Sequence, residues 1–352
     1  MSKTNIILSL TNTSFTFVES GFHINNLNID IEKGGFIGLV GESGSGKSTI
    51  GKVLACLYNH KEYNGLKIDK GTLEYYGNDL FKGKNLFDCS YRQLVPFRKD
   101  VQYLFQNHRA AVHRNMAVMQ TMMEAATIKH PDLSKQDKIH IIEDMLIEVG
   151  LLDGKVKNSK TAPILEKKSR NLSGGQIKRL ALGRTLLMNP KVIIADEPLT
   201  GLDASRKGRV LKYLTDVWEK RQESGDPLTI VLISHDIGMV LRLTKRVMVI
   251  YGDLYNKSSQ IVEENLSAGF ILNEENIHPY TNNLLAATHY FKSGESAQLV
   301  ENKQRPNNTL NGSCKYVSLC PTYVSNCESS IQTLKQYEKN KSHKIVCSVL
   351  NP

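Results

Sequence analysis

The stretch "GGFIGLVGESGSGKSTIGKVLACLY", from Gly34 to Tyr58, decides the fold. It opens with an apolar run that predicts a buried strand, passes through a glycine-rich loop and closes in a segment that predicts a helix. The loop, Gly41–Thr49, matches the phosphate-binding pattern G-x-x-x-x-G-K-[ST] in full, in the strand–loop–helix context that this motif requires. Glycines let backbone N–H groups curl around phosphates, Lys47 adds a positive charge, and the Ser48 hydroxyl is suited to Mg²⁺. Matching residues in the right context argue against a chance glycine-rich turn.

Further apolar runs alternate with helical patterns along the chain. The segments "DVQYLFQ" (100–106), "KVIIADEP" (191–198) and "PLTIVLISHD" (227–236) predict buried strands that end in polar or charged residues. Such strands, separated by helices, predict a largely parallel sheet covered on both faces, with a ligand crevice at the carboxyl ends of its strands. Short alternating runs between Ile6 and Ile31 predict an antiparallel meander at the N-terminus.

The bulk composition is that of a globular protein. The chain has 352 residues, 40% of them hydrophobic, and a formal net charge of +10. No apolar run approaches the ~18–20 residues of a membrane-spanning helix, and the first residues are too short an apolar stretch for a signal peptide, so we expect the chain to stay in the cytosol. The basic surplus is spread along the sequence, which favours a solvated surface over a nucleic-acid-binding patch.

A second glycine-containing segment, "NLSGGQIKRLALGRTLLMNP" (Asn171–Pro190), opens with Ser-Gly-Gly and then predicts a helix that Asn-Pro ends. The N-terminus of a helix is a place to hold an anion, and a Ser-capped helix of purely structural role is the alternative. The first phosphate loop already supplies one such place. The sequence therefore raises the question of why one chain needs two.

Polar residues at the predicted strand ends suit phosphoryl chemistry. Asp196 can hold Mg²⁺, directly or through water, and Glu197 is placed to polarise an attacking water as a general base. Gln106 offers an amide that can orient water or complete the Mg²⁺ shell. His235 can hydrogen-bond the γ-phosphate region, although a single histidine at a strand end is more often structural. Two adjacent carboxylates alone would favour a solvated turn, and the phosphate loop tips the balance toward a site.

The order of these motifs resembles that of an ATP-binding cassette (ABC) ATPase subunit. "GESGSGKST" is similar to the Walker A motif of that family, "YLFQ" to its Q-loop, "LSGGQ" to its signature, "VIIADEP" to Walker B, "LTGLD" to the D-loop and "LISHD" to the switch-histidine loop. The resemblance covers roughly residues 5–265, and "LSGGQ" is its most family-specific part.

The resemblance implies that two ATPase cores pair head to tail, so that each ATP lies between the phosphate loop of one core and the signature of the other. It makes Phe17 the best candidate for the aromatic that stacks on adenine, with Phe15 and Phe22 close by in sequence. The catalytic candidates are Glu197, His235 and Gln106. The Mg²⁺ candidates are Ser48, Gln106 and Asp196. The nucleotide-binding candidates are Phe17, Gly41, Ser43, Gly44, Ser45, Gly46, Lys47, Ser48, Thr49, Asp196, Ser173, Gly174, Gly175, Gln176 and Asp203.

A narrower resemblance lies in the C-terminal region. "HPYTNNLLAA" (278–287) and the cysteines at 314, 320, 327 and 347 resemble the extension of dipeptide, oligopeptide and nickel importer ATPases. Some members of that group are thought to hold an iron–sulfur cluster. By ligand count Cys314, Cys320, Cys327 and Cys347 suit [4Fe–4S] or Zn²⁺ equally, and thiols without metal are a further alternative.

The expected architecture is an α/β fold: a P-loop NTPase (RecA-like) core with an N-terminal antiparallel β subdomain, a helical signature subdomain and a small C-terminal extension. The core is expected over 1–267, its helical subdomain over about 110–185, and the extension with the cysteines over 268–352.

By resemblance the chain is the ATP-hydrolysing subunit of a bacterial importer for peptides or for nickel or metal chelates. ATP and Mg²⁺ are the implied cofactors. The implied partners are a second ATPase subunit, identical or a sister chain, two permease subunits and an extracellular or periplasmic solute-binding protein, with no nucleic acid. The implied location is peripheral, on the cytoplasmic face of the inner membrane.

Two departures and two rivals limit this hypothesis. After the Q-loop the chain reads "FQNHRAAVHR", with His108 and Arg114 where the subfamily has prolines, and "LEKKSRNLSGGQ" replaces the usual "YPHELSGGQ". The first departure lies by the surface that receives the membrane subunit, so it puts the partner and the solute in doubt rather than the ATPase chemistry. The rivals are an ABC ATPase that acts on nucleic acid or ribosomes, and a regulatory subunit with degenerate catalysis. The chain has neither the second core nor the long coiled-coil arms common in the first, and intact motifs argue against the second.

Overall fold

The computed structural model describes residues 5–58, 65–154, 163–200, 204–254, 256–265, 277–293, 314–325, 327, 334–337, 340–347 and 350. The chain divides into two compact units, which are described separately. One unit comprises Met1–Cys89 with Val231–Pro352, and the other comprises Ser90–Ile230. The chain passes from the second unit back to the first within strand β7 (Thr229–Ser234).

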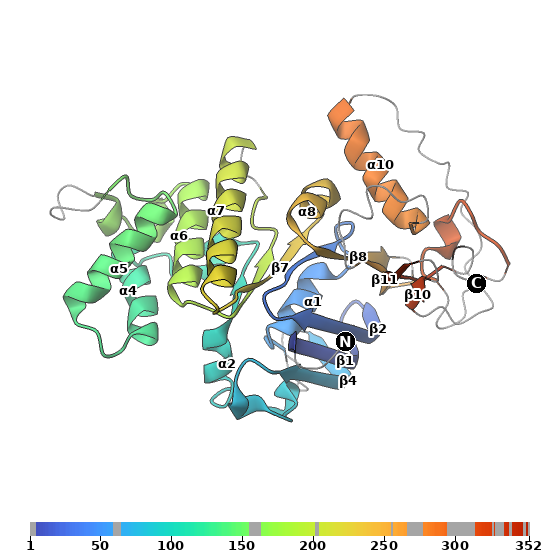
Figure 1. The fold of residues 1–352 in the computed structure, drawn as a ribbon, viewed down its shortest axis with the longest axis horizontal. Helices are drawn as coiled ribbons and strands as arrows, with labels where there is room; N and C mark the ends of the chain where they lie inside the picture. Colours follow the sequence, from blue (N-terminus) through green and yellow to red (C-terminus); the bar gives the residue numbers. More distant parts are fainter. Residues whose placement is uncertain are drawn as a thin grey trace. The chain divides into compact units, whose positions relative to one another are not determined.

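The first unit is built on a mixed sheet (Figure 1). Residues 23–32 and 66–75 largely alternate buried and exposed side chains, as one face packed on a core requires. Its strands, in sheet order, are β4 (Leu66–Tyr75), β1 (Ile6–Phe17), β2 (His23–Glu32), β9 (Ser258–Asn265), β8 (Arg246–Asp253) and β3 (Phe36–Val40). β1 pairs antiparallel with both β2 and β4, so the predicted N-terminal antiparallel subdomain is confirmed. Every residue of β3 is buried, and β3 pairs in parallel with β8.

The C-terminal residues join this same sheet. β11 (Asn340–Ile345) pairs antiparallel with β9, and β10 (Lys335–Tyr337) pairs with β11. The helices of this unit are α1 (Lys47–Leu54), α8 (Ile237–Leu243) and α10 (Pro279–Ser293). Glu264 in β9 forms a buried ion pair with Arg246 of β8 and a partly buried one with Lys344 of β11, and these join three strands at one point. Arg246 lowers the pKa of the Glu264 carboxyl against the opposing effect of burial. The domain boundary near residue 268 stays a prediction.

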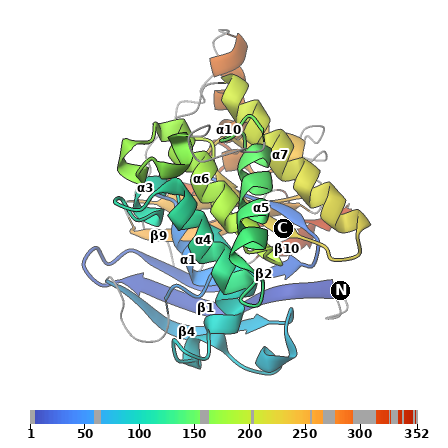
Figure 2. The ribbon, with the colours of Figure 1, turned by 90° about the vertical axis from the view of Figure 1, so that its left-hand side faces the viewer.

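The second unit combines strands and a helical bundle. β5 (Val101–Leu104) pairs in parallel with β6 (Val192–Asp196), in the register Val101 to Val192. The helices are α2 (Val95–Asp100), α3 (His108–Ala111), α4 (Val118–Lys129), α5 (Lys135–Glu148), α6 (Gly174–Leu187) and α7 (Ala204–Glu223). α4, α5 and α6 pack against one another, as Figure 2 shows. The parallel pair, the preceding mixed sheet and these helices confirm the predicted α/β class.

Helix α5 begins and ends where its sequence indicates. The Ser134 hydroxyl oxygen accepts a hydrogen bond from the Asp137 backbone N–H, which satisfies one of the open donors of the first turn. The apolar positions Ile142 and Leu146 are fully buried. Gly150, with φ +70°, takes the left-handed conformation that stops a helix.

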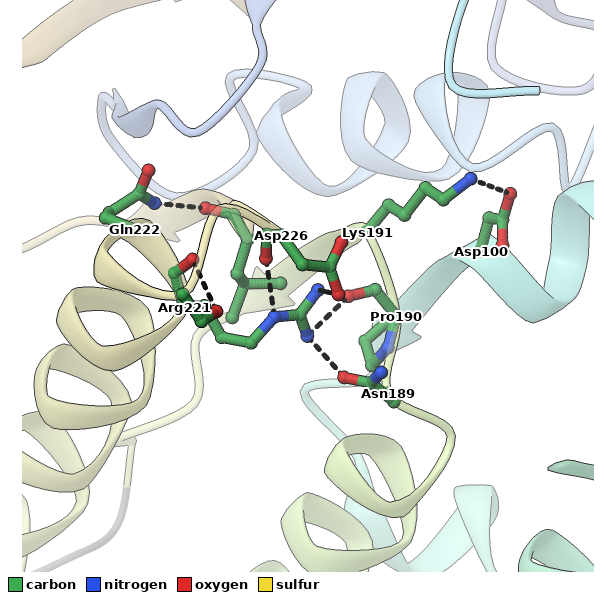
Figure 3. Close-up of polar contacts among 9 residues, drawn as sticks. Asp100, Asn189, Pro190, Lys191, Arg221, Gln222 and Asp226 are labelled. Atoms are coloured by element: carbon green, nitrogen blue, oxygen red, sulfur yellow. Dashed lines mark hydrogen bonds and ion pairs between the residues drawn. The ribbon is translucent and has the colours of Figure 1, made fainter. Parts of the chain in front are cut away.

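A polar cluster around Arg221 lies at the amino-terminal end of β6 (Figure 3). The Arg221 guanidinium donates to the Asn189 side chain at 2.5 Å and to the Pro190 carbonyl at 3.3 Å, and it forms an ion pair with Asp226 at 2.8 Å. Lys191, at the start of β6, forms an ion pair with Asp100 at 3.3 Å. These contacts join the end of α7 to the beginning of β6, and so fix the strand whose other end carries the predicted acidic residues.

Candidate active site

The glycine-rich loop lies between β3 and α1, as predicted, and its glycines are needed for two different reasons. Gly44 (φ +84°) and Gly46 (φ +90°) adopt backbone conformations that other residues rarely take. A Cβ on Gly41 would come within 2.1 Å of the Ile250 carbonyl oxygen, so this glycine allows the loop to pass close to β8. The loop therefore keeps its backbone N–H groups on a tight curve at the start of α1, where an anion is favoured.

Lys47 is held against its own loop. Its side chain is buried, and its ammonium donates hydrogen bonds to the carbonyl oxygens of Gly41 at 2.9 Å and Glu42 at 2.5 Å. The Ser45 hydroxyl lies 3.3 Å from the same ammonium. Ser48 and Thr49 follow on the first turn of α1 and are half-buried. These contacts tie the Lys47 ammonium to the backbone of the phosphate loop.

The loop is packed firmly on the strands behind it. Ser45 is almost fully buried, and its carbonyl accepts a hydrogen bond from the Ser259 hydroxyl at 2.7 Å. A Cβ on Gly252 would lie 2.6 Å from the Ser45 Cα, which shows how closely β8 approaches. Ser43 and Gly44 are exposed at the tip. The base of the loop is thus fixed, and its tip is open to a ligand.

Two aromatic rings lie near the loop, and the sequence singled out one of them. Phe15 is fully buried, which excludes it from stacking on a ligand. Phe17 is half-buried and meets Phe22 edge to face, with ring centroids 6.4 Å apart. A Cβ on Gly46 would lie 3.7 Å from the Phe22 ring, so Phe22 is next to the phosphate loop. The role of Phe17 stays a prediction, and Phe22 joins it as a second aromatic that the sequence alone did not select.

His235 follows β7 directly and is exposed. The next residue, Asp236, caps helix α8, because its carboxylate accepts a hydrogen bond from the Met239 N–H at 2.9 Å. The short Ser-His-Asp turn therefore presents the imidazole at the carboxyl end of the strand. The first unit in this way carries Phe17, the phosphate loop and His235.

The second unit carries the acidic pair at the carboxyl end of β6. Asp196 is buried, and its carboxylate accepts a hydrogen bond from the Tyr103 hydroxyl at 2.8 Å. Glu197 is also buried, and its carboxylate accepts a hydrogen bond from the Thr200 hydroxyl at 2.9 Å. Gln106 follows the neighbouring parallel strand β5 and is exposed. Because parallel strands end at the same edge, Gln106 and the acidic pair share one edge of this unit.

Three side chains around the acidic pair, Asp196 and Glu197, escaped the sequence analysis. Thr200 orients the Glu197 carboxylate, and the Lys178 ammonium donates to the Thr200 carbonyl. Burial lowers the pKa of Lys178, the positive charge of Lys207 lowers it further, and the carboxylate of Glu197 raises it. Tyr103 could have been suspected, since an aromatic hydroxyl at a strand end often hydrogen-bonds a carboxylate.

The Ser-Gly-Gly segment begins helix α6, as predicted. The Ser173 hydroxyl accepts from the Gln176 N–H at 3.2 Å, and the Gln176 amide oxygen accepts from the Ser173 N–H at 3.0 Å. This is a complete capping box. Ser173 and Gly174 are exposed, and a Cβ on Gly174 would meet no atom within 4 Å. Asp203, predicted in the D-loop, lies outside the described residues.

The C-terminal cysteines do not form a metal site as arranged. Cys314, Cys327 and Cys347 are buried and Cys320 is half-buried. Burial raises the pKa of the Cys314 thiol to about 12, and the negative charges of the other three cysteines raise it too. Among the described residues, no group of three or more His, Cys, Asp or Glu is placed to hold a metal ion. No catalytic step is assigned to these cysteines.

Comparison with known proteins decides the family. The family described as ABC transporter matches residues 24–200, which span the phosphate loop, the signature and the acidic pair. The chain belongs to the ABC transporter family. The match confirms the resemblance that the order of the motifs indicated.

Two relatives show which branch of the family this chain resembles. It is 33% identical to the oligopeptide transport ATP-binding protein OppF of Streptococcus mutans, over 80% of this chain and 81% of that protein. It is 30% identical to the dipeptide transport ATP-binding protein DppF of Lactococcus lactis, over 82% of each chain. The predicted similarity to oligopeptide and dipeptide ATPase subunits is thus confirmed.

Solved structures agree on the fold. The dimeric structure of MJ0796, a bacterial ABC transporter cassette, superimposes with a TM-score of 0.56 at 23% identity, over 72% of this chain and 97% of that one. A structure of cbiO1 from Clostridium perfringens gives a TM-score of 0.57 at 22% identity, over 82% of this chain and 99% of that one. Within the described residues, no helix is both long and apolar enough to cross a membrane.

Proposed function

We propose that this chain is the ATP-hydrolysing, nucleotide-binding subunit of a bacterial importer that takes up peptides. The observation that carries the proposal is a complete phosphate loop, with Lys47 held over it, in a chain that covers most of the length of peptide-transport ATPase relatives. In this proposal Lys47, Ser48 and Asp196 hold the phosphates and Mg²⁺. Glu197 accepts a proton from the attacking water, and Gln106 and His235 report the presence of the γ-phosphate to a membrane partner.

The residues present fit a Mg²⁺–nucleotide. A hydroxyl on Ser48, an amide on Gln106 and a carboxylate on Asp196 are the oxygen ligands that Mg²⁺ prefers. The ion would neutralise charge on the phosphates, and this chain's own groups would orient them and remove the proton of water. Adding Mg²⁺–ATP to the purified chain should give phosphate release that Lys47→Ala abolishes. Release that persists in Lys47→Ala would contradict the assignment of the loop.

The partners belong to the same proposal. They are a second ATPase subunit, two permease subunits and a solute-binding protein, with the chain peripheral on the cytoplasmic face of the membrane. Relatives named for oligopeptide and dipeptide transport favour peptides over nickel or metal chelates as the solute. Co-purification with a permease, rather than with nucleic acid or ribosomes, is the expected result, and transport assays with di- and oligopeptides against nickel would identify the solute.

A metal at Cys314, Cys320, Cys327 and Cys347 is a separate proposal. Four cysteines in one C-terminal region and the resemblance support it, and the side-chain arrangement of the described residues does not. Thiolates are the ligating form, so bound iron or zinc would have to lower the raised pKa of Cys314. Iron and zinc analysis of anaerobically purified protein tests it, and a protein free of both metals would contradict it.

A further inference from the structure

A tyrosine of the C-terminal region lies directly behind the phosphate loop. Tyr280 is the second residue of α10, drawn in orange in Figure 1, and it is 2% exposed. Its ring packs edge to face on Tyr251 of β8, with centroids 4.9 Å apart, and against Tyr316, with centroids 5.4 Å apart. These three rings, Tyr251, Tyr280 and Tyr316, form what we call the tyrosine cluster. Its packing leaves the Tyr280 ring little freedom to move.

The hydroxyl of Tyr280 is bonded to the phosphate loop itself. It accepts a hydrogen bond from the backbone N–H of Glu42 at 3.0 Å. That N–H belongs to the peptide unit between Gly41 and Glu42, and the carbonyl of the same unit accepts from the Lys47 ammonium at 2.9 Å. In a trans peptide the N–H and the C=O point in opposite directions within one plane. Tyr280 and Lys47 therefore hold the same peptide plane from its two sides.

Tyr280 is in turn held by the core sheet. Its backbone N–H donates to His278 Nδ1 at 3.2 Å, and the His278 N–H donates to the Glu263 carboxylate at 3.2 Å. Glu263, in β9, is fully buried, and its other carboxylate oxygen lies 2.6 Å from His343 Nε2 of β11. The start of α10 is thus anchored to two strands. A hydroxyl on so fixed a support can set the orientation of a flexible glycine peptide.

We propose that Tyr280 is a positioning residue for nucleotide binding, whose hydroxyl fixes the Gly41–Glu42 peptide and so keeps the Lys47 ammonium where the phosphates bind. The proposal deepens the proposed function and rests on the role given there to the phosphate loop. It gives the C-terminal region a direct part in the ATP site. Without the hydroxyl, the Gly41–Glu42 peptide loses one of its restraints, and the carbonyl that holds the Lys47 ammonium is less firmly fixed.

The test compares two buried tyrosines in the full-length chain. Tyr280→Phe removes the hydroxyl and keeps the ring. Tyr316→Phe is the matched control, because the Tyr316 hydroxyl accepts from the Asn283 amide at 2.5 Å within the same cluster. We expect Tyr280→Phe to raise the Kd for Mg²⁺–ATP by about threefold to tenfold, the range set by one lost hydrogen bond, and Tyr316→Phe to leave it as in the wild type. Both variants should unfold at similar temperatures.

A double-variant cycle with Lys47→Ala shows whether Tyr280 acts through Lys47. In the Lys47→Ala background, Tyr280→Phe should change the Kd no further. The proposal is overturned by an unchanged Kd in Tyr280→Phe, by an equal rise in Tyr316→Phe, by a thermal midpoint that falls in Tyr280→Phe alone, or by the same rise in both backgrounds. If Lys47→Ala itself leaves the Kd unchanged, the proposed function fails at the phosphate loop, which is a distinguishable result.

Discussion

Glu197 has an unusual backbone conformation. It is a non-glycine residue with φ +48°, directly after the last residue of β6. Such a conformation costs of order 1 kcal/mol or more and persists where the surroundings over-determine it. Here the Thr200 hydroxyl holds the carboxylate, and the buried Asp196 precedes it. A backbone conformation of this kind is typical of functional sites, which agrees with a proposed role for Glu197 as the base.

Glu197→Gln tests that role at the level of one atom. The amide has the size of the carboxylate and can still meet Thr200, but it cannot take a proton from water. We expect ATP to remain bound while turnover falls by at least about 100-fold, the usual loss for a missing general base. Single-turnover phosphate release and nucleotide retention measure the two effects. A variant that hydrolyses ATP at near the wild-type rate would show that the base is another group.

We expect the buried side chain of His108 to make the stability of the folded protein depend on pH. Its side chain is 3% exposed, and neither ring nitrogen has a hydrogen-bond partner in the described part of the chain. Burial, and secondarily the charge of Lys178, lowers the pKa of His108 from 6.5 to about 4. The unfolded chain therefore binds the proton more readily, so stability is intact above pH 6.5 and is lost as the pH falls toward 4, by on the order of 1–3 kcal/mol.

His108→Leu should remove this dependence. The leucine keeps the buried volume and carries no titrating group, so the thermal midpoint should fall less between pH 7 and pH 5 than in the wild type. The same substitution at His113, which is exposed in the same segment, is the control for the loss of a histidine. Equal pH dependence in wild type and His108→Leu would show that the buried imidazole is not the source.

Sequence reasoning at this scale found residues whose role follows from a motif and missed those whose role follows from contact. Lys47, Asp196 and Glu197 could be named because their spacing within strand, loop and helix is local. Tyr103 could not be tied to Asp196, since a hydrogen-bond partner 93 residues away leaves no local pattern. Thr200 lies only three residues from Glu197, and its contact was missed although it is local. His108 stood out only as a departure from the family pattern.

Among the elements, helix α6 is where substitutions best separate an effect on stability from an effect on ATP turnover. Ser173 caps the helix, so Ser173→Ala should destabilise the second unit by about 0.5–2 kcal/mol. Ser173→Asp restores a capping oxygen but places a negative charge where the proposed partner's triphosphate lies. We expect both variants to lose ATP turnover and only Ser173→Ala to lose stability, as measured by phosphate release and thermal unfolding. Full activity in Ser173→Asp would show that this helix end does not face a phosphate.

The elements themselves were largely predictable, and their long-range pairing was not. Short apolar runs indicated β1 and β2, and the capping pattern at Ser134 indicated α5, because each signal lies within one element. The pairing of β11 with β9 joins residues about 80 positions apart, such as Lys344 and Glu264. A three-residue register of this kind carries no sequence signal, so the C-terminal region was expected as an attached part and its strand in the core sheet was not foreseen.

At the scale of the whole molecule, Gly174 is a glycine that no contact within the described part of the chain requires. Gly41 and Gly252 are required by close contacts within the protein, whereas a side chain on Gly174 would meet nothing within 4 Å, and its φ is an ordinary helical one. Its own fold therefore gives no reason for a glycine at the first turn of α6, where alanine would be favoured by about 1 kcal/mol. In the proposed dimer, a phosphate that approaches the helix from a second core supplies such a reason, and it would explain why the chain has two segments suited to an anion.

Mixing two inactive variants tests the proposed head-to-tail dimer. Lys47→Ala disables the phosphate loop and Ser173→Asp disables the signature, so each variant alone should be inactive. In a mixed dimer one site receives both defects and the other receives none, because its loop comes from the Ser173→Asp chain and its signature from the Lys47→Ala chain. Random pairing of two copies should then restore about a quarter of the wild-type turnover per chain. In the converse mixture of the double variant with wild type, each site of a mixed dimer carries one defect. Turnover per chain should there fall from the half expected without exchange of chains to about a quarter, which comes from the wild-type pairs. No recovery on mixing would exclude a composite site made by two copies of this chain.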